Sequence, residues 1–307
     1  MPPNDLPIFR PLTGVYEPSG IQQLADGRFI VVEDEEKHAL GLLDISGGQV
    51  RHKALNAPFW SWLHGDFWKL DDLEGVTADR AGNIYAITSH SRDSDGDERK
   101  SRERLVRFRI EGDDVVDPRV VGGLKRHLTA AHPELAAAAG IRQVKSEGGL
   151  SIEALEMSAD QSRLLIGFRS PLLAGRAIIA SIENPGAIFD ADERPRIGVP
   201  LTTLDLGGNG IRGMSWVPSL AGYLLIAGPV AREQVEFQLW FWRGGSGDRP
   251  RRVSVAGLPG FEHAEGVTPA VIDGRECIIL VSDDGSREEG HFAHFLILHP
   301  EQLRIAD

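Results

Sequence analysis

Polar and charged residues recur at corresponding positions of five similar segments in this 307-residue chain. Each segment opens on a polar residue, continues as an apolar-rich run, turns, and ends on a polar or small residue after a second run. In an antiparallel hairpin, the first residue of one strand and the last residue of the next lie at the same end. We therefore expect the segment starts and ends to meet in space. The starts are Glu17, Glu74, Glu153, Arg212 and Glu265, and the ends are Glu33, His90, Arg169, Gly228 and Asp283.

This predicted ring is rich in carboxylates. Closely spaced carboxylates cannot all stay ionised unless protons, arginines or a hard cation compensate them. Calcium takes oxygen ligands, about six to eight of them. The pattern therefore favours a Ca²⁺ site built by Glu17, Glu74, Glu153 and Glu265. Two other interpretations stay open: the acids line a water-filled channel, or they pair with the arginines.

The same ring offers groups for catalysis. His90 is the expected general base, because imidazole titrates near neutral pH. Arg169 and Arg212 are expected to bind an anionic group or to stabilise a developing oxyanion. Further contacts to a ligand are expected from Glu33, Ser91, Arg92, Ser170 and Asp283.

The elements that must position these residues are short strands. In the second segment, strands are expected at residues 74–78, 84–88, 105–110 and 120–124, with turn residues at 79–83. Repeats of about 40 to 50 residues built of short strands are typical of a β-propeller. The sequence predicts an all-β fold, a single five-bladed β-propeller domain over residues 1–307. Residues 7–14 are expected to supply the fourth strand of the last blade, which closes the ring and removes a free sheet edge.

Two stretches interrupt the repeat, at residues 57–70 and 125–147. The first holds Trp60, Trp62 and Trp68, which could form a lid over the channel or simply pack under their own loop. In the second, residues 129–140 are expected to form a short helix. A sixth blade within residues 112–150 is an open alternative.

Composition excludes several classes of function. The net charge of −12 argues against a nucleic-acid partner. Cys277 is the single cysteine, so no internal disulfide can form. No segment is long enough to span a membrane, and the N-terminus does not resemble a signal peptide. We expect a cytoplasmic protein with a small-molecule ligand, for which the arginines favour an anionic one.

Several of these segments resemble a bacterial propeller family known only as a domain of unknown function. They are DLEGVTAD (72–79), AITSHSR (86–92), RERLVRFRI (102–110), LLIGFRSPLLAGRAII (164–179), LDLGGNGIRGM (204–214) and AEGVTP (264–269). The resemblance implies a propeller, with residues 89–92 and 167–171 at the channel mouth. More distantly, the chain is similar to phytase-like, gluconolactonase and strictosidine-synthase-like propellers, of which several hold Ca²⁺ with acids at the channel mouth.

Two functions from different classes follow. The first is a Ca²⁺-dependent hydrolase of a small ester, lactone or phosphoester. The second is a non-enzymatic propeller that binds a small molecule or a protein, in which the acids only orient the arginines. A purely structural ring is a third interpretation.

Overall fold

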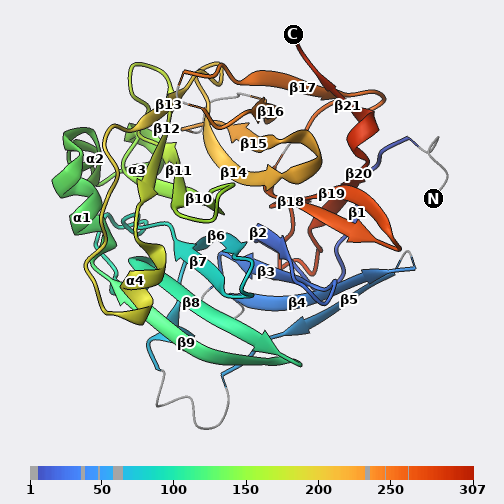
Figure 1. Cartoon of the computed structure of the whole chain (residues 1–307), viewed down its shortest axis with the longest axis horizontal. Helices are drawn as coiled ribbons and strands as arrows, with labels where there is room; N and C mark the ends of the chain where they lie inside the picture. The colour runs from blue at the N-terminus through green and yellow to red at the C-terminus, as the bar shows by residue number, and fades with distance from the viewer. Residues whose placement is uncertain are drawn as a thin grey trace.

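The computed structural model describes residues 6–35, 39–47, 49–57, 65–231, 236–245, 247–261 and 263–307. Its strands form five antiparallel sheets, arranged as blades around a central channel (Figure 1). The predicted five-bladed β-propeller is therefore confirmed. Among the described residues, no helix is long and apolar enough to cross a membrane.

The blades follow the chain in order. Blade 1 contains β2 (Pro18–Gln23), β3 (Phe29–Glu33), β4 (Leu40–Ser46) and β5 (Gln49–Ala54). Blade 2 contains β6 (Leu73–Ala78), β7 (Ile84–Thr88), β8 (Arg104–Glu111) and β9 (Asp114–Gly122). Blade 3 contains β10 (Ser151–Met157), β11 (Leu164–Ser170), β12 (Ala177–Ile182) and β13 (Thr202–Leu204). Blade 4 contains β14 (Gly210–Val217), β15 (Gly222–Gly228), β16 (Gln238–Trp242), β17 (Arg251–Val255) and β21 (Leu303–Ile305). Blade 5 contains β18 (Ala264–Ile272), β19 (Arg275–Ser282), β20 (His294–Leu298) and β1 (Arg10–Pro11).

Local turn chemistry explains the hairpins that start each blade. Between β6 and β7, one carboxylate oxygen of Asp79 accepts the backbone N–H groups of Ala81 and Asn83, each at 2.9 Å. Gly82 adopts a φ of 84°, which glycine reaches without steric cost. The turn therefore returns the chain in register, and Leu73 at the start of β6 pairs with Thr88 at the end of β7.

Each end of the chain adds an outer strand to a blade. Arg10 of β1 pairs with Phe295 of β20, so the N-terminal strand completes the last blade, as the sequence predicts. The C-terminal strand β21 pairs with β17 through Val253 and Ile305. This fifth strand of blade 4 has no counterpart in the sequence prediction.

Apolar side chains fill the spaces between neighbouring blades. Each of the five buried clusters draws its members mainly from two adjacent blades. In one of them, Ile30 of blade 1 packs in the same cluster as Val76 and Phe108 of blade 2. Burying one large apolar side chain is worth about 1.5–3 kcal/mol. Because these contacts join successive blades, they hold the inner strands around the channel.

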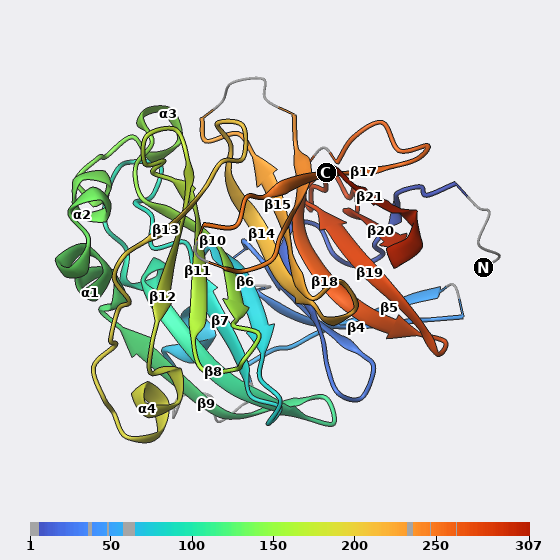
Figure 2. The same cartoon turned by 45° about the horizontal axis from the view of Figure 1, so that its top comes forward.

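The helical insertion joins blades 2 and 3. Helices α1 (Leu124–Ala131) and α2 (Pro133–Ala139) lie together outside the ring, and α3 (Val144–Glu147) follows (Figure 2). Leu128 and Leu135 are buried in the cluster that blades 2 and 3 share. The predicted helix at 129–140 is therefore two helices, broken before Pro133. Residues 123–150 hold no strand and β9 belongs to blade 2, so there is no sixth blade in this region.

The remaining short elements lie on connections. Helix α4 (Pro185–Asp190) follows β12, and Phe189 contacts Tyr85 of blade 2 with ring centroids 5.8 Å apart. The 3₁₀ helices are Phe67–Lys69, Lys100–Arg102, Pro218–Leu220 and Pro300–Gln302. Phe67 packs on Phe108, which anchors the end of the insertion predicted at residues 57–70. Trp60 and Trp62 lie outside the described residues.

Candidate functional site at the channel mouth

One residue of each inner strand lies at a β-bulge. At this bulge the register between the first two strands of the blade shifts by one residue. One residue of the inner strand therefore has no partner on the second strand. The inner strands are β2, β6, β10, β14 and β18. A bulge bends the strand locally and changes the direction in which the side chain of the extra residue points. The five bulge residues are Ser19, Glu74, Glu153, Arg212 and Glu265. The sequence-based alignment is therefore wrong in blade 1, where Ser19 and not Glu17 corresponds to Glu74.

A glycine follows four of these bulge residues because the neighbouring inner strand passes close by. A Cβ on Gly75 would lie 2.6 Å from the backbone nitrogen of Leu155 in the next blade. A Cβ on Gly213 would overlap the carbonyl oxygen of Glu265. The recurring charged residue–glycine pair thus has a physical cause: the first residue points into the channel, and the second lets the strands pack.

Two arginines and two glutamates form a ladder across the floor of the mouth. The carboxylate of Glu153 is held at both oxygens, with Oε1 2.7 Å from Arg169 Nη1 and Oε2 2.6 Å from Arg212 Nη1. The same Nη1 of Arg212 lies 2.8 Å from Glu265 Oε1. Burial alone would lower the pKa of Arg212, but Glu153 and Glu265 outweigh it and raise that pKa. The ladder is formally neutral, with two positive and two negative charges.

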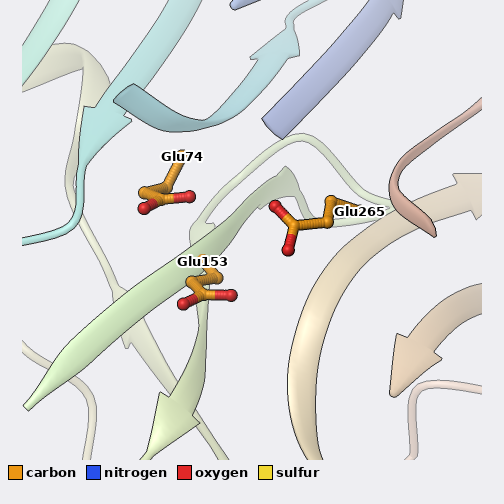
Figure 3. Close-up of side chains that lie close together, drawn as sticks. All are labelled: Glu74, Glu153 and Glu265. Atoms are coloured by element: carbon orange, nitrogen blue, oxygen red, sulfur yellow. The ribbon is translucent and has the colours of Figure 1, made fainter. Parts of the chain in front are cut away.

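Glu74 faces this ladder without a partner. Its side chain is 9% exposed, and no hydrogen bond or ion pair to it is found in the described part of the chain. Carboxylate oxygens of Glu74, Glu153 and Glu265 all lie within 4.8 Å of one another, and the three side chains point into a shared space (Figure 3). Burial, followed by repulsion from Glu153 and Asp72, raises the pKa of Glu74 well above its ordinary value.

Three more acids lie beside Glu74. Asp72 accepts hydrogen bonds from Ser89 Oγ, from Ser91 Oγ at 3.2 Å and from Arg102 Nη1 at 3.1 Å. Burial and the neighbouring Asp72 raise the pKa of Asp34 to about 8. Burial, together with Glu17, raises the pKa of Asp283 to about 6. This side of the mouth is therefore short of positive charge.

These groups surround one cavity of about 560 Å³. Its floor is formed by the bulge residues and by the three aspartates, and its rim includes Arg92, Arg142 and Lys145. Arg142 Nη2 lies 3.1 Å from Asp97 Oδ1, so the helical insertion contacts the loop that contains Asp97. A cavity of this size with polar walls fits a small polar ligand.

The structure brings together most of the predicted site. The residues that line the cavity are Glu74, Glu153, Glu265, Arg169, Arg212, Asp283, Ser91 and Arg92. Glu17, Glu33, His90 and Ser170 are not among the lining residues. Glu33 is buried and accepts the backbone N–H of Tyr16 at 2.9 Å, and the hydroxyl of Ser170 donates to the carbonyl oxygen of Gly149.

His90 occupies an interior position. It is fully buried, and its Nδ1 lies 2.8 Å from the carbonyl oxygen of Thr88, to which it donates. Its Nε2 has no hydrogen-bond partner among the described residues. Burial lowers the pKa of His90 to about 4. A buried neutral imidazole that does not line the cavity is not placed to accept a proton from a bound substrate.

The cavity residues that escaped the sequence analysis include Ser19, Asp34, Asp72 and Arg102. Asp34 follows the end of the first segment by one residue, and Asp72 precedes Glu74 by two. The sequence analysis considered only the first and last residue of each segment, so it missed both aspartates. The signal that would have located Ser19 is the glycine that follows three of the other bulge residues, because Gly20 follows Ser19 in the same way.

Comparisons with known proteins agree with this architecture. The model of a family described as Protein of unknown function (DUF3616) matches residues 135–294, which is more than half of the chain. The chain therefore belongs to this family. A search of curated proteins found no match.

Solved structures are similar to this chain at low sequence identity. The proposed oxidoreductase (glucose dehydrogenase) of Thermus thermophilus is 15% identical, with a TM-score of 0.50 over 95% of this chain and 100% of that one. The periplasmic gluconolactonase of Pseudomonas aeruginosa is 12% identical, with a TM-score of 0.41 over 94% of this chain and 71% of that one. At these identities the likeness concerns the fold alone.

Proposed function

We propose that the protein is a hydrolase that cleaves an ester, lactone or phosphoester bond of a small polar molecule in the mouth cavity. The observation that carries this proposal is the ladder of Arg169, Glu153 and Arg212 on the cavity floor. Guanidinium groups held in place before the reaction stabilise an oxyanion that develops in the transition state. Arginine is suited to this role because its planar guanidinium offers five N–H donors in a fixed geometry.

The proton acceptor in this proposal is Asp283. Its carboxyl lines the cavity and, with a pKa of about 6, is mostly ionised at neutral pH while still basic enough to take a proton from water. Asp283 takes the role that the sequence analysis gave to His90, because His90 is buried away from the cavity. Ser91 lines the same cavity and offers a hydroxyl to orient a ligand.

The donor set fits calcium in part. Two oxygens bound to one Ca²⁺ lie at most about 5 Å apart, and the three glutamate oxygens lie within 4.8 Å of one another. Glu153 is already occupied at both oxygens by arginines. Glu74 and Glu265 Oε2, for which the described residues offer no partner, are therefore the groups that would hold the ion. When bound, calcium would polarise the scissile bond and lower the pKa of a bound water.

A second candidate function is a binding propeller without catalysis. The doubly paired Glu153 favours it, because the ladder neutralises two of the acids with no metal. In that case the arginines would hold an anionic ligand, and chelators would change nothing.

The deciding experiment has two parts. Elemental analysis of protein purified without chelator should find calcium near one ion per chain, and a panel of chromogenic esters, lactones and phosphoesters should include a substrate. Replacing Arg169 with Ala should then lower kcat by about 10²-fold or more, the usual cost of one oxyanion-stabilising donor. Absence of metal together with absence of turnover would support the binding propeller. Turnover that Arg169→Ala leaves unchanged would contradict the proposed role of the ladder.

A further inference from the structure

The ring of bulge residues is interrupted at one position. Glu74, Glu153, Arg212 and Glu265 are long and charged, whereas Ser19 is short and uncharged. Strand β2 lies between β6 and β18 in the ring, so Ser19 stands between Glu74 and Glu265 (Figure 1). Ser19 lines both the mouth cavity and a smaller void of about 10 Å³ beneath it. The serine therefore leaves a gap in the ring that opens to the cavity.

The two glutamates beside this gap are less compensated than the third. Glu74 is nine-tenths buried and has no hydrogen-bond or ion-pair partner in the described ranges. Glu265 pairs with Arg212 through Oε1, and no partner of its Oε2 is found there. Glu153, on the far side, is held at both oxygens. The carboxylate charge that lacks a compensating cation therefore lies on the side of the ring next to Ser19.

The second group of acids strengthens this asymmetry. Asp34, Asp72 and Asp283 also line the cavity, and Arg102 is the cation that contacts Asp72. Asp34, Asp72 and Asp283 all add to the electrostatic repulsion on the ring glutamates. A positive charge in the gap would lie close to two carboxylates in a site largely shielded from water, where the attraction between charges is stronger than in solvent.

We propose that the gap above Ser19, between Glu74 and Glu265, is a subsite for one compact positive group: a divalent cation or the primary ammonium group of a substrate. Both sources share the chemistry that recognises them, a small cation bound by carboxylate oxygens. The inference deepens the proposed function and rests on it for the use of the site, but its test measures binding and needs no turnover.

Filling the gap with a tethered ammonium tests the proposal. Lysine carries a compact charge on a flexible four-carbon stem, so Ser19→Lys should place that charge between the glutamates. Ser19→Gln fills the gap without charge. Ser254→Lys adds the same charge at an exposed position on β17, three strands out from the inner strand β14. We expect a higher Tm for Ser19→Lys than for Ser19→Gln.

The probes are calcium chloride and methylammonium chloride, added at equal ionic strength to protein first dialysed against a chelator, with sodium chloride as the reference. One of the two should raise the Tm of the wild-type protein and of Ser254→Lys by about 3 °C or more at saturation. A response to calcium identifies a metal subsite, and a response to methylammonium identifies an ammonium subsite. Ser19→Lys should respond to neither.

Three results would overturn the proposal: a wild-type protein that responds to neither probe, a Ser19→Lys protein that still responds, or equal Tm values for Ser19→Lys and Ser19→Gln. If Ser19→Lys does not fold, Glu74→Gln decides, because it must abolish the response of the wild-type protein. Binding of a probe without hydrolysis of any test substrate would support the subsite and contradict the proposed hydrolase. Hydrolysis of a test substrate without binding of either probe would support the proposed hydrolase and contradict the subsite.

Discussion

Arg212 Nη1 lies 2.6 Å from Glu153 Oε2, and this pair joins the inner strands of blades 3 and 4 at the channel mouth. The same nitrogen reaches Glu265 of blade 5 at 2.8 Å. One guanidinium therefore links three successive blades. It occupies the position where each of its two neighbouring blades carries a glutamate, so the ring contains its own counter-ion. We therefore expect the stability of the ring to depend on this guanidinium.

Replacing Arg212 with Ala should destabilise the fold strongly. The change leaves Glu265 without its cation and Glu153 with only Arg169, in a buried site where removing one partner of an ion pair costs about 3–5 kcal/mol. Denaturant unfolding measures the loss. Arg252→Ala is the matched control, because Arg252 is 57% exposed and its pair with Glu236 is 3.6 Å long. It should cost less than about 1 kcal/mol. Similar losses for both variants would contradict the role of the ladder.

Replacing Gly213 with Ala tests how closely the blades pack. The added Cβ would overlap the backbone carbonyl of Glu265, and backbone cannot yield as a side-chain tip can. We expect a loss of about 2–3 kcal/mol or a failure to fold. Gly186→Ala, in α4, is the control, since the nearest atom to its new Cβ is an Asp190 oxygen at 3.7 Å. That variant should keep wild-type stability within about 0.5 kcal/mol. Wild-type unfolding of Gly213→Ala would show that the inner strands are looser than described.

The fold could be predicted because its signals are local. The sequence predicts β7 at the bounds the structure gives it, and β6 to within one residue, from alternation and turn residues alone. The outer strand β9 was misplaced by several residues and β21 was missed. Strand β9 follows β8 directly through a turn at residues 112–113, but its side chains are exposed or only half-buried along its whole length. Strand β21 pairs with β17 across about fifty residues of chain. Outer strands of this kind carry little alternation to reveal them.

The sequence predicted those site residues that stand at the start or end of a hairpin. Counting located Glu74, Glu153, Arg212 and Glu265, because a bulge residue opens each segment. It failed at Glu17, where an acid that is not the bulge residue precedes Ser19 by two positions. Counting also correctly identified His90 as the end of the second segment, but the side chain is buried and does not line the cavity. His90 has a φ of 56°, and this left-handed backbone belongs to a side chain buried away from the cavity.

Asp283 and His90 should behave differently when replaced. If Asp283 is the proton acceptor, Asp283→Asn should lower kcat on an identified substrate by about 10²-fold or more and remove the rise in rate with pH that centres near 6. His90→Gln keeps the pH profile, because that side chain does not line the cavity. It should instead lower stability, since a buried donor to the Thr88 carbonyl is disturbed. An unchanged pH profile in Asp283→Asn would contradict the assignment.

Glu156 makes the stability of the ring depend on pH. Its side chain is buried within the inner strand β10, where Thr77 of blade 2 and Ser215 of blade 4 hydrogen-bond to it. Burial raises its pKa from 4.5 to about 8, and those hydrogen bonds only partly oppose the shift. The folded state therefore keeps this proton at pH values where the unfolded chain has lost it.

The sign of the effect follows from that difference. The contribution of protonated Glu156 to stability is fully present below about pH 4.5 and is lost as the pH rises to about 8. In that range each pH unit lowers the free energy of unfolding by up to about 1.4 kcal/mol. Glu156→Gln keeps a neutral side chain of the same shape, so its free energy of unfolding should fall less steeply between pH 5 and 8. Urea unfolding at pH 5, 6.5 and 8 compares it with the exposed control Glu276→Gln, which should follow the wild-type protein. Parallel curves for Glu156→Gln and the wild-type protein would show that Glu156 is ionised in the folded state.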